Sequence, residues 1–145
     1  MFRLVCGRGL LQNVLQSSAV CSQNGRSALH LSSRCNEIFR IQDEADFKEK
    51  VLSKKDKLVV VDFFATWCGP CKTMGPRLET IVGGRATEVD LALVDVDQLD
   101  GLAAEFKVSV IPAIFALKNG KPVDQFVGQK DEDQLKAFID GALKK

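Results

Sequence analysis

Apolar residues follow two alternating patterns along the chain, unbroken runs and helical spacing. The stretches 58–65 (LVVVDFFA) and 89–96 (VDLALVDV) are dense in β-branched and apolar residues, which predicts strands buried on both faces. Between 99 and 106, apolar residues recur at the spacing of one helical face. The same reasoning predicts strands at 38–41, 58–65, 89–96, 113–117 and 123–127, and helices at 43–53, 68–82, 99–106 and after Asp131.

Local signals mark two boundaries between these elements. Asn119-Gly120 separates the last two predicted strands and favours a two-residue hairpin turn. Asp131, followed three residues later by Gln134, has the pattern of a helix capping box. Strands joined through helices pair in parallel, whereas the hairpin adds antiparallel strands. We therefore predict an α/β fold for residues 37–145, with a central mixed β-sheet flanked by helices on both faces.

The leading segment, residues 1–36, differs from the rest in its charge pattern. It contains four arginines, several serines and neither lysine nor acidic residue, and its apolar residues recur at roughly helical spacing. This composition is typical of a mitochondrial transit peptide, because a positive amphipathic helix is attracted to anionic membranes. A secretory signal is disfavoured since Arg8 interrupts its candidate apolar core, and an extension without a targeting role is the remaining alternative. We expect cleavage between Arg34 and Arg40.

Length and composition exclude several classes of protein. The chain has 145 residues, 46% of them hydrophobic, and a formal net charge of +1. That balance, without a basic stripe, argues against nucleic-acid binding. No stretch approaches the ~18 apolar residues that a membrane-spanning helix needs. We expect one domain whose mature form associates with neither nucleic acid nor membrane.

Two of the five cysteines have a spacing that suggests chemistry. Cys68 and Cys71 lie where a predicted buried strand ends and the next helix begins. A cysteine at a helix N-terminus faces unpaired N–H groups and the positive end of the helix dipole, which favour the thiolate, so Cys68 is the predicted nucleophile. Cys71 is close enough to close a disulfide, and we expect greater burial to keep it protonated. Gly69 and Pro70 are predicted to fix the turn and tune the pair.

Two other interpretations of this cysteine pair compete with a redox role. A structural zinc half-site needs two further ligands, but residues 72–145 contain neither cysteine nor histidine. The other candidates fall in the predicted transit peptide and are Cys6, Cys21, His30 and Cys35. An inert structural disulfide is disfavoured in a reducing compartment. We therefore predict a redox pair and no metal site.

The stretch VVDFFATWCGPCKTMGP, the dipeptide Ile111-Pro112, the KNG turn and the tail VGQKDEDQLKAFI together resemble the thioredoxin family. With the arginine-rich leader, the chain is similar to the mitochondrial thioredoxins of animals. The resemblance covers residues 38–143 and implies a thioredoxin fold and protein-disulfide reductase activity without a bound cofactor. It also implies a flavin-containing thioredoxin reductase that supplies electrons from NADPH, and peroxiredoxins and other oxidised proteins of the mitochondrial matrix as targets.

The resemblance assigns roles to individual positions. Cys68 would attack a target disulfide, and Cys71 would then attack Cys68 to release the reduced target. Asp62 matches a buried aspartate that accepts the Cys71 proton, and its apolar neighbours favour burial over a solvated strand face. Pro112 matches a cis-proline opposite the dithiol. The same substrate groove is expected to include Trp67, Ile111 and Gly128.

Three positions depart from the family pattern. Phe64 stands where many relatives carry tryptophan, and Ala113 follows the proline where threonine is usual. Leu93 occupies the position of a buried lysine that commonly faces the aspartate. Without that cation, we predict a higher pKa for Asp62 than in a lysine-bearing relative.

Two other functions remain open from the sequence. A secretory disulfide isomerase or oxidase is disfavoured, because proline stands between the cysteines where such enzymes often carry histidine, and the terminal Lys144-Lys145 is no retention signal. A docking module could use the same fold without redox turnover. Reduction of insulin disulfides distinguishes an enzyme from such a module.

Overall fold

The computed structural model describes residues 37–145, so the predicted transit peptide lies outside the described residues. The strands are β1 Ile38–Arg40, β2 Leu58–Phe64, β3 Val89–Asp95, β4 Ala113–Lys118 and β5 Lys121–Val127. The helices are α1 Glu44–Phe47, α2 Gly69–Gly83, α3 Asp100–Glu105 and α4 Glu132–Leu143, with a π-helical turn, η1, at Lys48–Leu52. The predicted order of strands and helices is confirmed.

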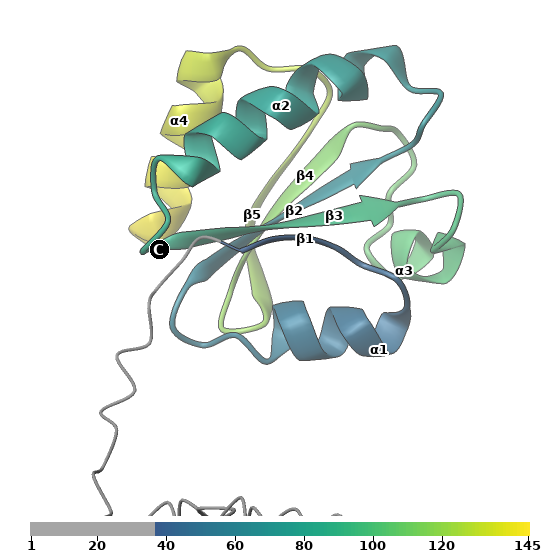
Figure 1. The fold of residues 1–145 in the computed structure, drawn as a ribbon, viewed down its shortest axis with the longest axis horizontal. Helices are drawn as coiled ribbons and strands as arrows, with labels where there is room; N and C mark the ends of the chain where they lie inside the picture. The colour runs from purple at the N-terminus through teal and green to yellow at the C-terminus, as the bar shows by residue number, and fades with distance from the viewer. Residues whose placement is uncertain (1–36) are drawn as a thin grey trace, which may run out of the picture. The chain divides into compact units, whose positions relative to one another are not determined.

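The five strands form one mixed sheet in the order β1-β3-β2-β4-β5 (Figure 1). β3 pairs in parallel with both β1 and β2, whereas β4 is antiparallel to β2 and to β5. The predicted pairing directions are therefore confirmed. β2 lies at the centre, and only its last residue escapes full burial. The carboxyl end of this central strand leads directly to the cysteines.

Helices cover both faces of the sheet, as predicted (Figure 1). On one face, α2 and α4 pack on alternate residues of the strands, and Leu78 and Ile139 are completely buried there. On the other, α1 and α3 enclose a second core in which the Phe106 ring contacts three others, edge-on with Phe47 and Phe115 and tilted with Phe63. Successive side chains of each strand point to opposite faces of the sheet, so the same strands contribute residues to both cores. The sheet is thus held rigidly from both sides.

Two details differ from the pattern-based prediction. The single helix expected at 43–53 is a short α1 followed by the wider turn η1, where Ser53 N donates to Lys48 O at 3.0 Å. β5 begins at Lys121 rather than 123 and contains Pro122, with a register shift opposite it. An edge strand can include proline because its outer N–H groups have no ladder partner.

The turn between β4 and β5 also packs against the first helical segment. Asn119 and Gly120 have φ values of 55° and 73°, as the predicted hairpin turn requires. A Cβ atom at Gly120 would lie 2.6 Å from Leu52 O. The glycine therefore serves both the left-handed backbone and this close approach. The predicted capping box at Asp131 and Gln134 is confirmed.

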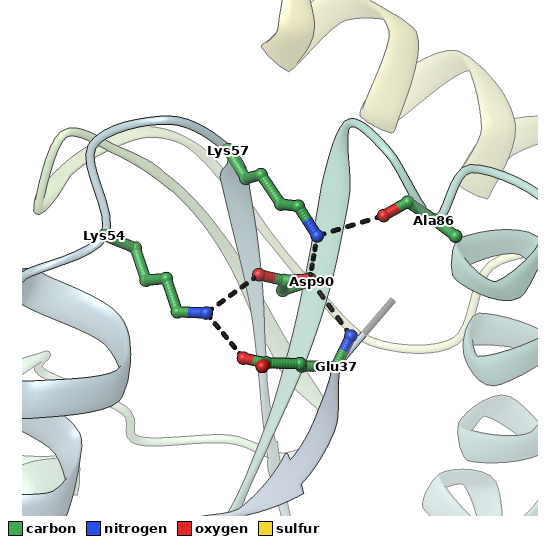
Figure 2. Close-up of polar contacts among 5 residues, drawn as sticks. All are labelled: Glu37, Lys54, Lys57, Ala86 and Asp90. Carbon is green, nitrogen blue, oxygen red and sulfur yellow. Dashed lines mark hydrogen bonds and ion pairs between the residues drawn. The ribbon is translucent and has the colours of Figure 1, made fainter. Parts of the chain in front are cut away.

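A buried carboxylate holds the residue before β1 against the sheet (Figure 2). It lies near the amino end of β3, whereas the cysteines follow the carboxyl end of the neighbouring parallel strand β2. Asp90, with a fully buried side chain, accepts from the Glu37 backbone N–H at 3.1 Å and from Lys57 Nζ at 3.0 Å. Lys54 Nζ lies 3.4 Å from Asp90 and 2.5 Å from Glu37. A buried charge is tolerated when it is paired in this way. We call these four residues the Asp90 cluster.

Candidate active site

Cys68 and Cys71 occupy the junction of β2 and α2 as a closed disulfide. Their sulfurs are 2.02 Å apart and their Cα atoms 5.3 Å apart. Cys68 is the N-cap of α2, and its Sγ accepts from the Cys71 backbone N–H at 3.2 Å. Gly69 and Pro70 form the start of the helix, where proline removes no needed donor. The predicted disulfide and its position at a helix N-terminus are confirmed.

Burial does not distinguish the two cysteines, contrary to our expectation that Cys71 is the more buried. Each is 5% exposed, and both pack with Ala65. The closed disulfide accounts for this result, because it holds both sulfurs in one small apolar cluster. The two sulfurs differ instead in their surroundings. Cys68 receives the backbone N–H, whereas Cys71 lines a pocket that contains Asp62.

Of the predicted groove residues, Ile111 lies directly against the cysteine pair. The Ile111-Pro112 peptide bond is cis, and Ile111 packs against the cluster of the two cysteines. Gly128 N donates to Pro112 O at 2.8 Å, with the glycine at a φ of 92°. Trp67 is 69% exposed. The Ile111 and Pro112 region is therefore tied to both the dithiol and the end of β5.

Sequence reasoning missed three residues of this surface. Trp67 Nε1 donates to Asp97 Oδ2 at 2.9 Å, which restrains the exposed indole. Val110, two residues before the cis-proline, and Val127, directly before its partner glycine, are both exposed. The sequence shows that Val110 and Val127 are next to the groove positions Ile111 and Gly128, but it does not show that they are exposed, because exposure depends on the tertiary fold. An exposed apolar surface of this kind suits contact with another protein.

Asp62 is deeply buried in the middle of β2, as predicted. It is 2% exposed and lies between Leu93 of β3 and Ile114 of β4 in the register of the sheet. Its Oδ1 is buried and has no hydrogen-bond partner among the described residues. Burial, with a smaller contribution from the negative charge of Glu79, raises the pKa of Asp62 to about 7. A carboxyl with that pKa can exchange a proton near neutral pH.

A pocket of about 310 Å³ connects this carboxyl with Cys71. Its lining includes side chains from three strands and one helix, among them Arg40, Asp62, Phe64, Cys71, Glu79 and Leu93. The Arg40 guanidinium lies over the Phe64 ring, 5.4 Å from its centre. Two positions that depart from the family pattern thus line the space beside Asp62.

Other kinds of site find no support in the described part of the chain. Residues 37–145 contain no group of three or more histidine, cysteine or acidic side chains arranged to hold a metal ion. None of the helices in that range is long and apolar enough to cross a membrane. The chemistry of the described residues is concentrated on the cysteine pair and Asp62.

Comparisons with known proteins agree with this geometry. The family model for thioredoxin matches residues 38–141. The mitochondrial thioredoxin of Rattus norvegicus is 49% identical over 76% of this chain and 66% of its own length, and that of Bos taurus is 48% identical over 77% and 67%. The chain thus spans about two thirds of the length of these relatives.

Solved structures give the same result. The thioredoxin of Fasciola hepatica is 38% identical, with a TM-score of 0.65 over 71% of this chain and 97% of the other. The thioredoxin of Malassezia sympodialis is 36% identical, with a TM-score of 0.66 over 79% and 96%.

Proposed function

The chain belongs to the thioredoxin family, and from this premise we propose that it is a protein-disulfide reductase. The family carries its redox chemistry on an active-site disulfide rather than on a bound cofactor. The observation that carries the proposal is the closed Cys68–Cys71 pair at the N-terminus of α2, with the buried acid Asp62 on the shared pocket. This arrangement contains a nucleophile, a resolving thiol and a proton acceptor.

In the first step, the Cys68 thiolate of the reduced protein attacks one sulfur of a target disulfide. A new bond joins Cys68 to the target, the target S–S bond breaks, and the departing sulfur leaves as a thiolate that takes a proton from water. The N-cap position supports this role for Cys68, because the Cys71 N–H and the helix dipole stabilise negative charge on its sulfur.

In the second step, Asp62 as a carboxylate takes the proton of the Cys71 thiol, directly or through water. The Cys71 thiolate attacks Cys68 Sγ, the mixed disulfide breaks, and its electron pair leaves with the target sulfur. That sulfur leaves as a thiolate and takes a proton from Asp62 or from water, so the target has gained two electrons and two protons, and the protein holds the Cys68–Cys71 disulfide. A pKa of about 7 suits Asp62 to this transfer, since either protonation state is accessible near neutral pH.

We assign target binding to the groove about the cis-proline. The contact of Ile111 with the cysteine pair and the bond from Gly128 N to Pro112 O support this assignment, and Trp67, Val110 and Val127 add exposed apolar surface. An extended target segment can pair with the backbone before Pro112 while its side chains contact these residues. Gly69 and Pro70 shape the turn that presents Cys68 to the same groove.

The mitochondrial names of the mammalian relatives support the cellular setting. We infer that residues 1–36 are a transit peptide and that residues 37–145 act in the mitochondrial matrix. Electrons would come from NADPH through a thioredoxin reductase, and peroxiredoxins and other oxidised matrix proteins would receive them. N-terminal sequencing of the protein from mitochondria tests both the compartment and the cleavage position.

Insulin reduction tests the activity itself. The full chain should reduce insulin disulfides when supplied with NADPH and a thioredoxin reductase, and Cys68→Ser should abolish turnover. Cys71→Ser should accumulate a mixed disulfide with the target, because the resolving thiol is missing. Cys35→Ser is the matched control and should retain activity. If Cys68→Ser were active, the assignment of the nucleophile would be wrong. If the wild-type chain bound targets without reducing them, it would be a docking module.

A further inference from the structure

The pocket beside Asp62 approaches the cysteine pair from a different direction than the groove. Cys71 lines this pocket, whereas the groove residues Trp67, Ile111 and Gly128 are not among the described residues that line it. A target bound at the groove would therefore leave the pocket open to water. Charged residues that line this pocket can therefore affect the transfer of the Cys71 proton to Asp62.

Glu79 faces this pocket from the same side of α2 as Cys71. Cys71, Gly75 and Glu79 are spaced four residues apart, which places them along one face of the helix, and all three line the pocket. A Cβ atom at Gly75 would meet no atom within 4 Å, so the middle position leaves open space. Glu79 is exposed and Asp62 is buried. The pocket consequently runs from the exposed carboxylate of Glu79 to the buried carboxyl of Asp62 and to Cys71 of the disulfide.

The charges around Asp62 are few. Its unpartnered Oδ1 belongs to a side chain that is 2% exposed, and Leu93 beside it is neutral. The other charged residues that line the pocket are Arg40 from β1 and Lys72 and Glu79 from α2. Arg40 and Lys72 are both exposed, and the Arg40 guanidinium is stacked over the Phe64 ring. No cation among the described residues is bonded to Asp62. Glu79 is the acidic residue that shares its pocket.

We propose that Glu79 is a positioning residue of the dithiol exchange, whose negative charge favours the protonated form of Asp62 and so sets the pH at which Asp62 takes the Cys71 proton. The inference rests on the proposed function, because it concerns the second step of that reaction. The repulsion between two carboxylates that share a site is its physical basis. The raised pKa of Asp62 agrees with this geometry.

The direct test is the titration of Asp62 in the full-length protein, followed by carbon-13 NMR of its carboxyl group. Glu79→Gln removes the charge and preserves the shape, so the Asp62 midpoint should fall by about half a pH unit, as expected for a like charge acting through a partly hydrated pocket. Glu79→Asp should retain most of the wild-type midpoint. Glu105→Gln changes an exposed glutamate on α3 and is the matched control. An unchanged midpoint in Glu79→Gln would overturn the proposal.

A kinetic measurement separates positioning from a structural role. The rate at which Cys71 resolves a preformed mixed disulfide at Cys68 should reach half its maximum at a lower pH in Glu79→Gln, by the same half unit. In an Asp62→Asn background, Glu79→Gln should no longer move that midpoint. A shift that persisted without the Asp62 carboxyl would also overturn the proposal.

The two proposals fail in distinguishable ways. Loss of insulin reduction in the wild-type chain would refute the proposed function. The Asp62 titration would still report whether Glu79 controls its proton.

Discussion

Replacing Asp62 by asparagine should stabilise the oxidised protein, and by more as the pH rises. Asp62 has a pKa of about 7 in the fold, against 3.8 for an unperturbed aspartate. Between these values the folded state holds a proton that the unfolded chain has released, so the free energy of unfolding falls as the pH rises. The destabilisation that this carboxyl causes is small at a pH below its pKa in the unfolded chain, and it reaches its full value at a pH above its pKa in the folded protein.

The magnitude follows from the difference between the two pKa values. About three units at 1.36 kcal/mol each correspond to a cost of about 4 kcal/mol at about pH 8.5, and of about 2 kcal/mol at about pH 5. Asparagine has nearly the same shape but no proton to lose. Asp62→Asn should therefore gain about 2 kcal/mol over the wild type between these two pH values, beyond any constant effect of the amide.

Urea unfolding of the oxidised protein at both pH values measures this difference. Asp56→Asn, at an exposed aspartate just before β2, is the matched control and should keep the wild-type pH dependence. If Asp62→Asn kept it as well, the buried carboxyl would not be what makes the fold sensitive to pH, and the reasoning would be refuted.

Three further changes test other contacts. Leu93→Lys should lower the pKa of Asp62 by about 1–3 units, because Leu93 is the neighbour of Asp62 across the sheet and the lysine would place a cation beside its carboxyl; an unchanged carboxyl titration by NMR would contradict this. Asp90→Ala should lower the free energy of unfolding in urea by about 1–3 kcal/mol, since it removes the acceptor of the Glu37 N–H and the buried carboxylate that pairs with Lys54 and Lys57; a loss below about 0.5 kcal/mol would contradict the role of the cluster. Gly120→Ala should cost more than about 1 kcal/mol, because a Cβ would clash with Leu52 O at a positive φ; wild-type thermal stability would contradict it.

Features with a local cause could be predicted from the sequence. The run around Asp62 is apolar enough to require burial on both faces, and the polar residue within it is conspicuous for that reason. Asn119-Gly120 and the Asp131 capping box depend on the backbone of two to four neighbouring residues. The position of Cys68 at a helix start follows from the strand before it and Pro70 after it.

Features that depend on distant residues could not be predicted in this way. Glu79 is seventeen positions from Asp62, and only the packing of α2 on the sheet places both on one pocket. The equal burial of Cys68 and Cys71 is a property of the closed disulfide, not of the helix alone. Asp90 belongs to an apolar run like that of Asp62, but its partners come from the residue before β1 and from the segment before β2.

The Asp90 cluster also has a consequence for where the mature chain can begin. The main-chain nitrogen of Glu37 lies 3.1 Å from the buried carboxylate. Proteolysis immediately before Glu37 would turn that amide into a charged α-ammonium and give Asp90 a third cation, whereas trimming one residue further would remove both this nitrogen and the carboxylate that neutralises Lys54. A ladder of start sites across 34–40 should therefore melt highest at Glu37. The melting temperature would then identify the start site that gives the most stable mature protein.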